Sequence, residues 1–314
     1  MATTTLRLIV LASLGATLFL VWQRELWLDE GYTYAFISAP AGIFWSLITG
    51  SEMNMAPYYL LTAAARRLTA APWLLRLISF ALSAATLVLL YRLAIQQFGK
   101  DVALMATALL ALNHYFVYHA SELRSYALTI CLATMLLGIT LSFWKRGRAR
   151  ELWGFLGVAV VLFYSHFLAG IYIGLLAIGI GIAVGKRHRG LVPLSCVLAV
   201  IGVACAVPAA VTMVANRGEN IAHIQPQSLP HMIRRALDLL GGHWFLFENE
   251  STRVGYGALA MVRHAGELAM AAIVAGLALW TICHRIQHPG APPAAVAMAA
   301  LGLVPLAIAL VASY

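Results

Sequence analysis

Apolar stretches long enough to cross a lipid bilayer recur along almost the whole chain. A transmembrane helix needs about 20 predominantly apolar residues to cross a hydrocarbon core about 30 Å thick. Only 11% of the 314 residues are charged, whereas soluble globular domains carry about 25%. The sequence therefore predicts an all-α, polytopic integral membrane protein. We expect about nine spans, at residues 5–23, 73–95, 102–119, 126–144, 152–166, 168–185, 191–213, 268–284 and 292–313.

Two regions need a specific interpretation. The apolar run 151–185 would be roughly 50 Å long as one helix, so we predict a hairpin of two short spans that separate near "YSHF" (164–167). Region 24–72 is apolar only in pieces, and "AGIFWSLITG" and "PYYLLTAAARRL" in it indicate interfacial helices, with a spanning helix as the alternative. We expect a single transmembrane domain over residues 1–314, with outer loops 24–72 and 214–267.

The charge distribution predicts the orientation. The layout places on one face only two acids, Asp101 and Glu151, so the whole formal net charge of +9 falls on that side, while the other ten basic and ten acidic residues cancel. Cytoplasmic loops carry such an excess, which implies a multi-pass protein of the cell (inner) membrane with a cytoplasmic N-terminus and no nucleic-acid partner. The basic residues of this face are Arg7, Arg92, Lys100, Lys145, Arg146, Arg148, Arg150, Lys186, Arg187, Arg189 and Arg285.

The outer loops carry the ionisable residues that could do chemistry. In "LWLDEGYTYAF" (26–36), Asp29 and Glu30 stand side by side at the edge of the first span. They could form a solvated turn that caps the next helix. They could equally supply a general base or a cation ligand at the membrane surface, because adjacent carboxylates repel and one of them can have a raised pKa.

A second polar stretch, "HASELRSY" (119–126), lies at another helix boundary. Glu122 and Tyr126 are four residues apart and share a helical face, whereas Glu122 and Arg124 do not. The stretch is either an interfacial anchor closed by a salt bridge or part of a site, because ionisable groups at a membrane boundary are costly unless paired or used. His166 in "FYSHF" is likewise either a turn residue or a catalyst.

These pieces, in order, resemble one family. The order is "WLDEGYTY", "NMAPYYLL", "ALLALNHYFVYHASELRSYAL" and "FYSHFLAGIY". It is similar to that of the GT-C membrane glycosyltransferases, which include protein O-mannosyltransferases and lipid A aminoarabinose transferases. The nearest likeness is to bacterial relatives of the dolichyl-phosphate-mannose–protein mannosyltransferases. The resemblance covers residues 5–185 and rests on order and spacing. It departs at Met55-Ala56-Pro57, where many members have His-Pro-Pro.

The resemblance implies a transferase that takes a sugar from a polyprenyl-phosphate donor to a protein, lipid or glycan acceptor on the outer membrane face, with inversion. It implies that Asp29, with its neighbour Glu30, is catalytic and that Asp29 is the base. The donor phosphate and sugar would contact Arg124, Glu122, Tyr126, His166, Arg76 and Tyr59. Membrane lipids would surround the donor's tail.

No cofactor is predicted. A divalent cation could sit at the paired acids, but no third ligand is evident in the sequence. Two alternatives to the transferase remain: a polytopic lipid or solute transporter (flippase), and a non-catalytic relative. The second arises because the family continues with further spans beyond a run like "LVPLAIALVASY", so a C-terminally truncated member is one expectation.

Overall fold

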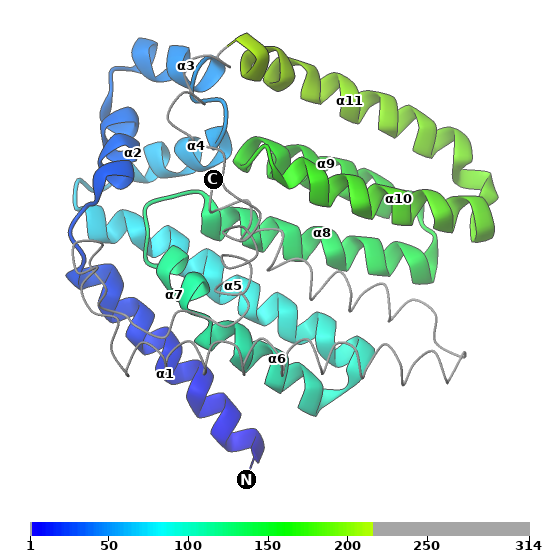
Figure 1. The fold of residues 1–314 in the computed structure, drawn as a ribbon, viewed down its shortest axis with the longest axis horizontal. Helices are drawn as coiled ribbons and strands as arrows, with labels where there is room; N and C mark the ends of the chain where they lie inside the picture. The colour runs from blue at the N-terminus through cyan, green and yellow to red at the C-terminus, as the bar shows by residue number, and fades with distance from the viewer. Residues whose placement is uncertain (1, 216–314) are drawn as a thin grey trace, which may run out of the picture. The chain divides into compact units, whose positions relative to one another are not determined.

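A computed structural model gives the structure of residues 2–215. Every element in this range is a helix, and the range contains no strand (Figure 1). All of these residues except Asn113–Tyr115 belong to one compact unit. The helices are α1 (Ala2–Gln23), α2 (Leu28–Ser38), α3 (Ala41–Thr49), α4 (Ala56–Arg66), α5 (Pro72–Phe98), α6 (Lys100–Leu112), α7 (His114–Ala120), α8 (Tyr126–Arg146), α9 (Ala149–Ser165), α10 (Ala169–Arg187), η1 (Arg189–Leu191) and α11 (Val192–Ala215).

Four helices are long and apolar enough to cross a membrane. They are α5, α8, α10 and the run Arg189–Thr212 within η1 and α11. A fifth crossing exists if Arg7–Gln23 and Leu28–Ser38, which are bent by 70° relative to each other, form one span. The predicted spans at 73–95, 126–144, 168–185 and 191–213 are thus confirmed as membrane-span-like helices.

The full set of nine spans is not confirmed. The predicted span 102–119 is divided at Asn113 into α6, of 13 residues, and the short α7, because an asparagine side chain competes for backbone hydrogen bonds and ends helices. The predicted span 152–166 is α9, whose 17 residues reach about 26 Å and fall short of a core about 30 Å thick. The predicted spans 268–284 and 292–313 and the outer loop beyond Ala215 lie outside the described residues.

The predicted break at "YSHF" is present. Helix α9 ends at Ser165, His166 has extended backbone (φ −164°, ψ 111°), and α10 starts at Ala169. The two helices are therefore separate, as the length of the run required.

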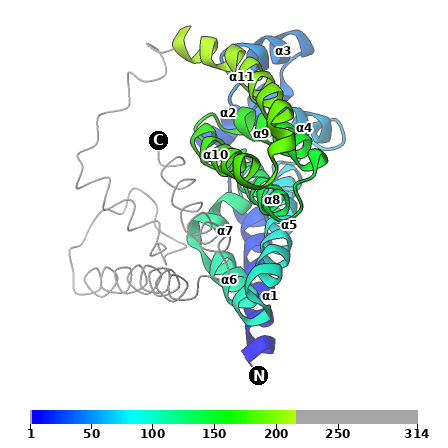
Figure 2. The ribbon, with the colours of Figure 1, turned by 90° about the vertical axis from the view of Figure 1, so that its right-hand side faces the viewer.

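The long helices have two chemically different ends (Figures 1 and 2). At one, which we call the site end, lie the α1–α2 junction, the start of α5, residues 116–125 and the α9–α10 turn. At the other, the basic end, lie the α5–α6, α8–α9 and α10–α11 connections. They carry Lys100, Lys145, Arg146, Arg148, Arg150, Lys186, Arg187 and Arg189. The ionisable stretches and the basic loops, predicted to face opposite sides, thus occupy opposite ends.

Region 24–72 forms three short helices at the site end. Helices α2, α3 and α4 have 11, 9 and 11 residues, which is about half the length that a span needs. Their apolar side chains form a core with the start of α5 and with residues 123–128. It consists of Ile37, Phe44, Ile48, Met55, Tyr58, Tyr59, Leu75, Leu123 and Leu128. This packing fixes the frame in which the polar residues of the site end are held.

Candidate functional site

A buried ion pair joins α2 to α5. The carboxylate of Glu30 accepts hydrogen bonds from Arg76 Nε at 2.8 Å and Arg76 Nη2 at 2.7 Å, and both side chains are almost completely buried. The same carboxylate accepts the backbone N–H of Leu123 at 2.6 Å and that of Trp27 at 3.4 Å, the latter because Glu30 is the third residue of α2 and caps the helix start. Each oxygen of Glu30 therefore has two donors, which fills its acceptor capacity.

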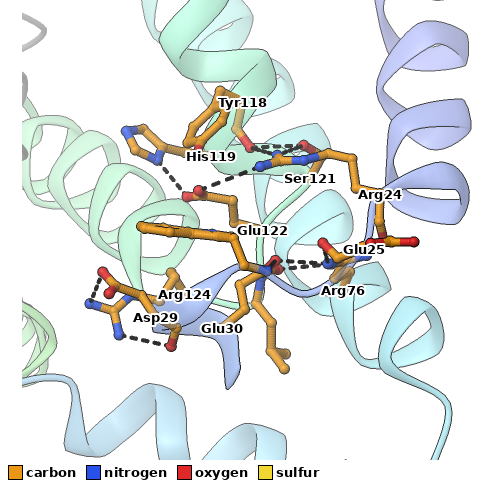
Figure 3. Close-up of polar contacts among 12 residues, drawn as sticks. Arg24, Glu25, Asp29, Glu30, Arg76, Tyr118, His119, Ser121, Glu122 and Arg124 are labelled. Atoms are coloured by element: carbon orange, nitrogen blue, oxygen red, sulfur yellow. Dashed lines mark hydrogen bonds and ion pairs between the residues drawn. The ribbon is translucent and has the colours of Figure 1, made fainter. Parts of the chain in front are cut away.

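Arg76 is as fully occupied as Glu30. Besides the carboxylate, its guanidinium donates to three backbone carbonyls: that of Val21 in the last turn of α1, and those of Arg24 and Glu25 just after α1 (Figure 3). A guanidinium has five N–H donors, and all five are used. The Glu30–Arg76 pair thus ties α1, α2, α5 and the 121–125 stretch together and retains no free group for a substrate.

Asp29 and Arg124 face each other on the more open side of this pair. Arg124 Nη2 lies 3.4 Å from Asp29 Oδ2, with the two side chains 14% and 36% exposed. Arg124 Nη1 also lies within 3.5 Å of the Asp29 carbonyl and of the Thr33 hydroxyl. This contact is longer than the Glu30–Arg76 bonds and engages one carboxylate oxygen, so Asp29 keeps acceptor capacity and access to solvent.

Glu122 lies on the other side of Arg124, among further polar side chains that we call, together with Asp29 and Arg124, the cluster. Its Oε2 is 2.9 Å from His119 Nδ1, and its Oε1 is 3.9 Å from Arg24 Nη2. Arg24 in turn donates to Ser121 Oγ at 2.8 Å, and its guanidinium lies 4.3 Å from the centre of the Tyr118 ring (Figure 3). The Glu122 side chain is completely buried, so its contacts with His119 and Arg24 compensate for the lost hydration.

Two rings extend the cluster to the α9–α10 turn. The Tyr126 ring centroid lies 4.4 Å from that of His119 and 6.0 Å from that of His166, and the Arg124 guanidinium is 5.9 Å from the Tyr126 ring. Burial, reinforced by Arg124 and by His119, lowers the pKa of His166 from 6.5 to about 4. The imidazole of His166 is therefore neutral at pH 7, so it can form hydrogen bonds but carries no charge.

The loop before α4 closes the cluster from another side. Asn54 Oδ1 accepts the Phe167 N–H at 3.0 Å, and the Met55 N–H donates to the Tyr164 carbonyl at 2.8 Å, with Met55 in the left-handed region at φ 78°. These two bonds attach the loop to the α9–α10 turn.

A further carboxyl group lies in that loop. The Tyr59 hydroxyl lies 3.4 Å from Glu52 Oε2. Burial raises the pKa of Glu52, opposed by the Tyr59 hydrogen bond and by the positive charge of Arg124. Glu52 is therefore a second carboxyl group within the electrostatic reach of Arg124.

Several polar atoms of this cluster lack a partner. Five buried side-chain N or O atoms have no hydrogen bond within the described part of the chain, and four of them belong to this cluster: Glu122 Oε1, Arg124 Nε, Ser125 Oγ and His166 Nδ1. Buried polar groups in native proteins nearly always have a hydrogen-bond partner. A buried polar group without one indicates a position where a ligand or a water molecule binds. Donors and acceptors are thus available beside the Asp29–Arg124 contact.

The structure brings all the sequence-predicted site residues to the site end, but in two environments. Asp29, Arg124, Glu122, Tyr126, His166 and Tyr59 line the cluster, whereas Glu30 and Arg76 are used up in holding it together. Sequence reasoning missed Arg24, Ser121 and Asn54 as members. Arg24 alone had a usable signal, as a basic residue directly after the first apolar stretch.

Within residues 2–215, no group of three His, Cys, Asp or Glu side chains is placed to hold a metal ion. Comparisons of the chain with protein-family models, with curated proteins and with solved structures found no match. What this site does therefore has to be argued from its own geometry.

Proposed function

We propose that the protein is a membrane glycosyltransferase that moves a sugar from a polyprenyl-phosphate donor to an acceptor at the site end. The observation that carries this proposal is the pairing of a partly exposed carboxylate, Asp29, with a mostly buried guanidinium, Arg124, next to four buried polar atoms that have no hydrogen-bond partner among the described residues. A base and an anion-binding cation a few ångströms apart are what a displacement at a glycosyl phosphate requires.

In this proposal Arg124 binds the donor phosphate. The guanidinium stabilises the negative charge that develops on the phosphate oxygen as the bond from the anomeric carbon to that oxygen breaks. The oxygen or nitrogen of the acceptor bonds to the anomeric carbon from the face opposite the leaving phosphate, which inverts that carbon. Asp29 accepts the proton that the acceptor hydroxyl or amine loses in this step. Neutral His166 and the Glu122 carboxylate would hydrogen-bond the sugar hydroxyls.

The distribution of buried charge supports chemistry at a surface over transport. Within the described residues, the buried acidic, basic and histidine side chains are Glu30, Arg76, His119, Glu122 and Glu151, and all of them lie near helix ends. Transporters instead place polar groups or broken helices at the bilayer midplane. With the basic end in the cytoplasm, as the positive-inside rule expects, the site would face the outer side of the cell membrane.

The test is sugar transfer in membranes that contain the full chain, with radiolabelled mannose, glucose or aminoarabinose on a polyprenyl phosphate. Asp29→Asn should lower turnover by at least about 100-fold, because a positioned general base contributes about 10²–10⁴. Arg124→Gln should raise the KM for the donor or lower kcat. Glu25→Gln, an exposed carboxylate four residues before Asp29, is the matched control and should transfer normally.

Normal transfer by a well-folded Asp29→Asn variant would exclude Asp29 as the base. Binding of all three donors without any turnover by the wild-type chain would instead identify a non-catalytic protein and refute the proposed function.

A further inference from the structure

A groove lies far from the candidate site, at the basic end. It runs between α5, α8 and α9 and has a volume of about 460 Å³, within the range of about 300–1,000 Å³ typical of small-molecule sites. Its apolar wall is formed mainly by Leu89, Leu93, Met135, Ile139 and Gly154, and its polar mouth by Ser142, Arg146, Arg150 and Glu151.

The shape and lining of the apolar part fit a hydrocarbon chain. Leu89 and Leu93 come from α5, Met135 and Ile139 from α8, and Gly154 supplies depth from α9. A Cβ at Gly154 would meet only Ile139 Cδ1, at 3.8 Å, so the absence of a side chain there leaves room in the groove. Helices α5 and α8 are long and apolar enough to cross a membrane, in which acyl chains would surround them.

The mouth carries two cations without an ion-pair partner. Arg146 and Arg150 are exposed, and neither makes a salt bridge with any other residue of the range 2–215. The nearby carboxylate of Glu151 is used otherwise: Ser142 Oγ donates to it at 2.7 Å, and the Arg148 backbone N–H at 3.1 Å. Two free guanidiniums at the end of an apolar groove match a phosphodiester joined to an acyl chain.

From these observations we propose that the groove binds an anionic phospholipid, with one acyl chain against Met135 and Ile139 and the phosphate between Arg146 and Arg150. Lys145 and Arg148, which are exposed in the same α8–α9 connection, add positive charge to this end and favour a lipid with net negative charge over a zwitterionic one. This site is independent of the proposed sugar transfer, because its residues share none with the cluster around Asp29.

The test uses the full chain in nanodiscs or detergent, with phosphatidylglycerol and phosphatidylcholine as probes and bound lipid measured by native mass spectrometry. The wild-type protein should retain phosphatidylglycerol preferentially. Arg146→Gln with Arg150→Gln should weaken binding about 30-fold, because each arginine near an anionic lipid surface contributes roughly five- to sixfold and the two contributions multiply. Arg187→Gln with Arg189→Gln is the matched control, because both arginines are exposed at the same end but do not line the groove.

A second pair of variants tests the apolar part. Gly154→Leu should fill the groove and reduce lipid retention, whereas Gly157→Leu, on the same helix in open space and outside the groove lining, should not. The proposal is overturned if phosphatidylglycerol and phosphatidylcholine are retained equally, if the two arginine pairs behave alike, or if Gly154→Leu has no effect. Competition by soluble glycerol phosphate as strong as that by the lipid would also overturn it, because the site would then recognise phosphate alone.

Discussion

The Glu30–Arg76 pair makes a quantitative prediction about stability. Glu30→Gln keeps the size of the side chain but leaves the Arg76 guanidinium buried, with its charge uncompensated and with only carbonyl and amide acceptors. Removing one partner of a buried ion pair costs about 3–5 kcal/mol. With about 2 °C per kcal/mol for a large domain, the thermal unfolding midpoint should fall by about 6–10 °C.

The assay is thermal unfolding of the full chain in a single detergent, followed by the fluorescence of its tryptophans. Glu25→Gln is the control, because the Glu25 side chain is exposed and only its backbone carbonyl contacts Arg76; its effect should stay within about 0.5 kcal/mol. The double variant Glu30→Gln with Arg76→Gln should lose less than the sum of the two single losses, because it removes the unpaired charge. The reasoning fails if Glu30→Gln and Glu25→Gln unfold at the same temperature, or if the two single losses add in the double variant.

Two further predictions concern stability elsewhere. Because the pKa of His166 is lowered to about 4 in the folded protein, the imidazole of the unfolded chain takes up its proton first as pH falls from 6.5 to 4. The free energy of unfolding should therefore fall by about 3 kcal/mol across this window, and the thermal midpoint of His166→Asn should fall less than that of the wild type. Equal falls in the midpoints of the two proteins would contradict the lowered pKa of His166. Gly147 ends α8 at φ 60°, where an added Cβ would collide with the His188 ring, so Gly147→Ala should cost at least about 1–2 kcal/mol of unfolding free energy in the same assay. Gly157→Ala, in open space in the middle of α9, should instead be neutral or stabilising, and a neutral Gly147→Ala would refute the argument.

Much of the fold could be predicted because the bilayer restricts it so strongly. Apolar runs of about 20 residues have one solution in lipid, which is a helix. The starts of α5 and α8 agree with the sequence within one residue, at Pro72 and Tyr126. The single span predicted at 102–119 is not confirmed, because average hydropathy does not show where Asn113 separates α6 from α7.

The arrangement of the site was less predictable. Asp29 and Glu30 are adjacent in the chain and look equivalent, but successive residues of a helix point about 100° apart. In α2 this rotation turns Glu30 into the core toward Arg76 and leaves Asp29 toward Arg124. Which of the two carboxylates faces the core depends on contacts with residues 46 and 93–95 positions away in the chain. The pattern of residues around 29 and 30 does not show these contacts.

The Glu30–Arg76 bond also restricts how the chain can be threaded through the bilayer. Helix α1 ends and α5 begins at this pair, so if both helices cross the membrane they must emerge on the same side. The intervening 24–72 region must then cross an even number of times or not at all, and its helices of 9 to 11 residues are each too short to cross. Because burying an unpaired carboxylate is costly, we expect Glu30 to remain in water during synthesis until Arg76, and later the Leu123 amide, reach that same side.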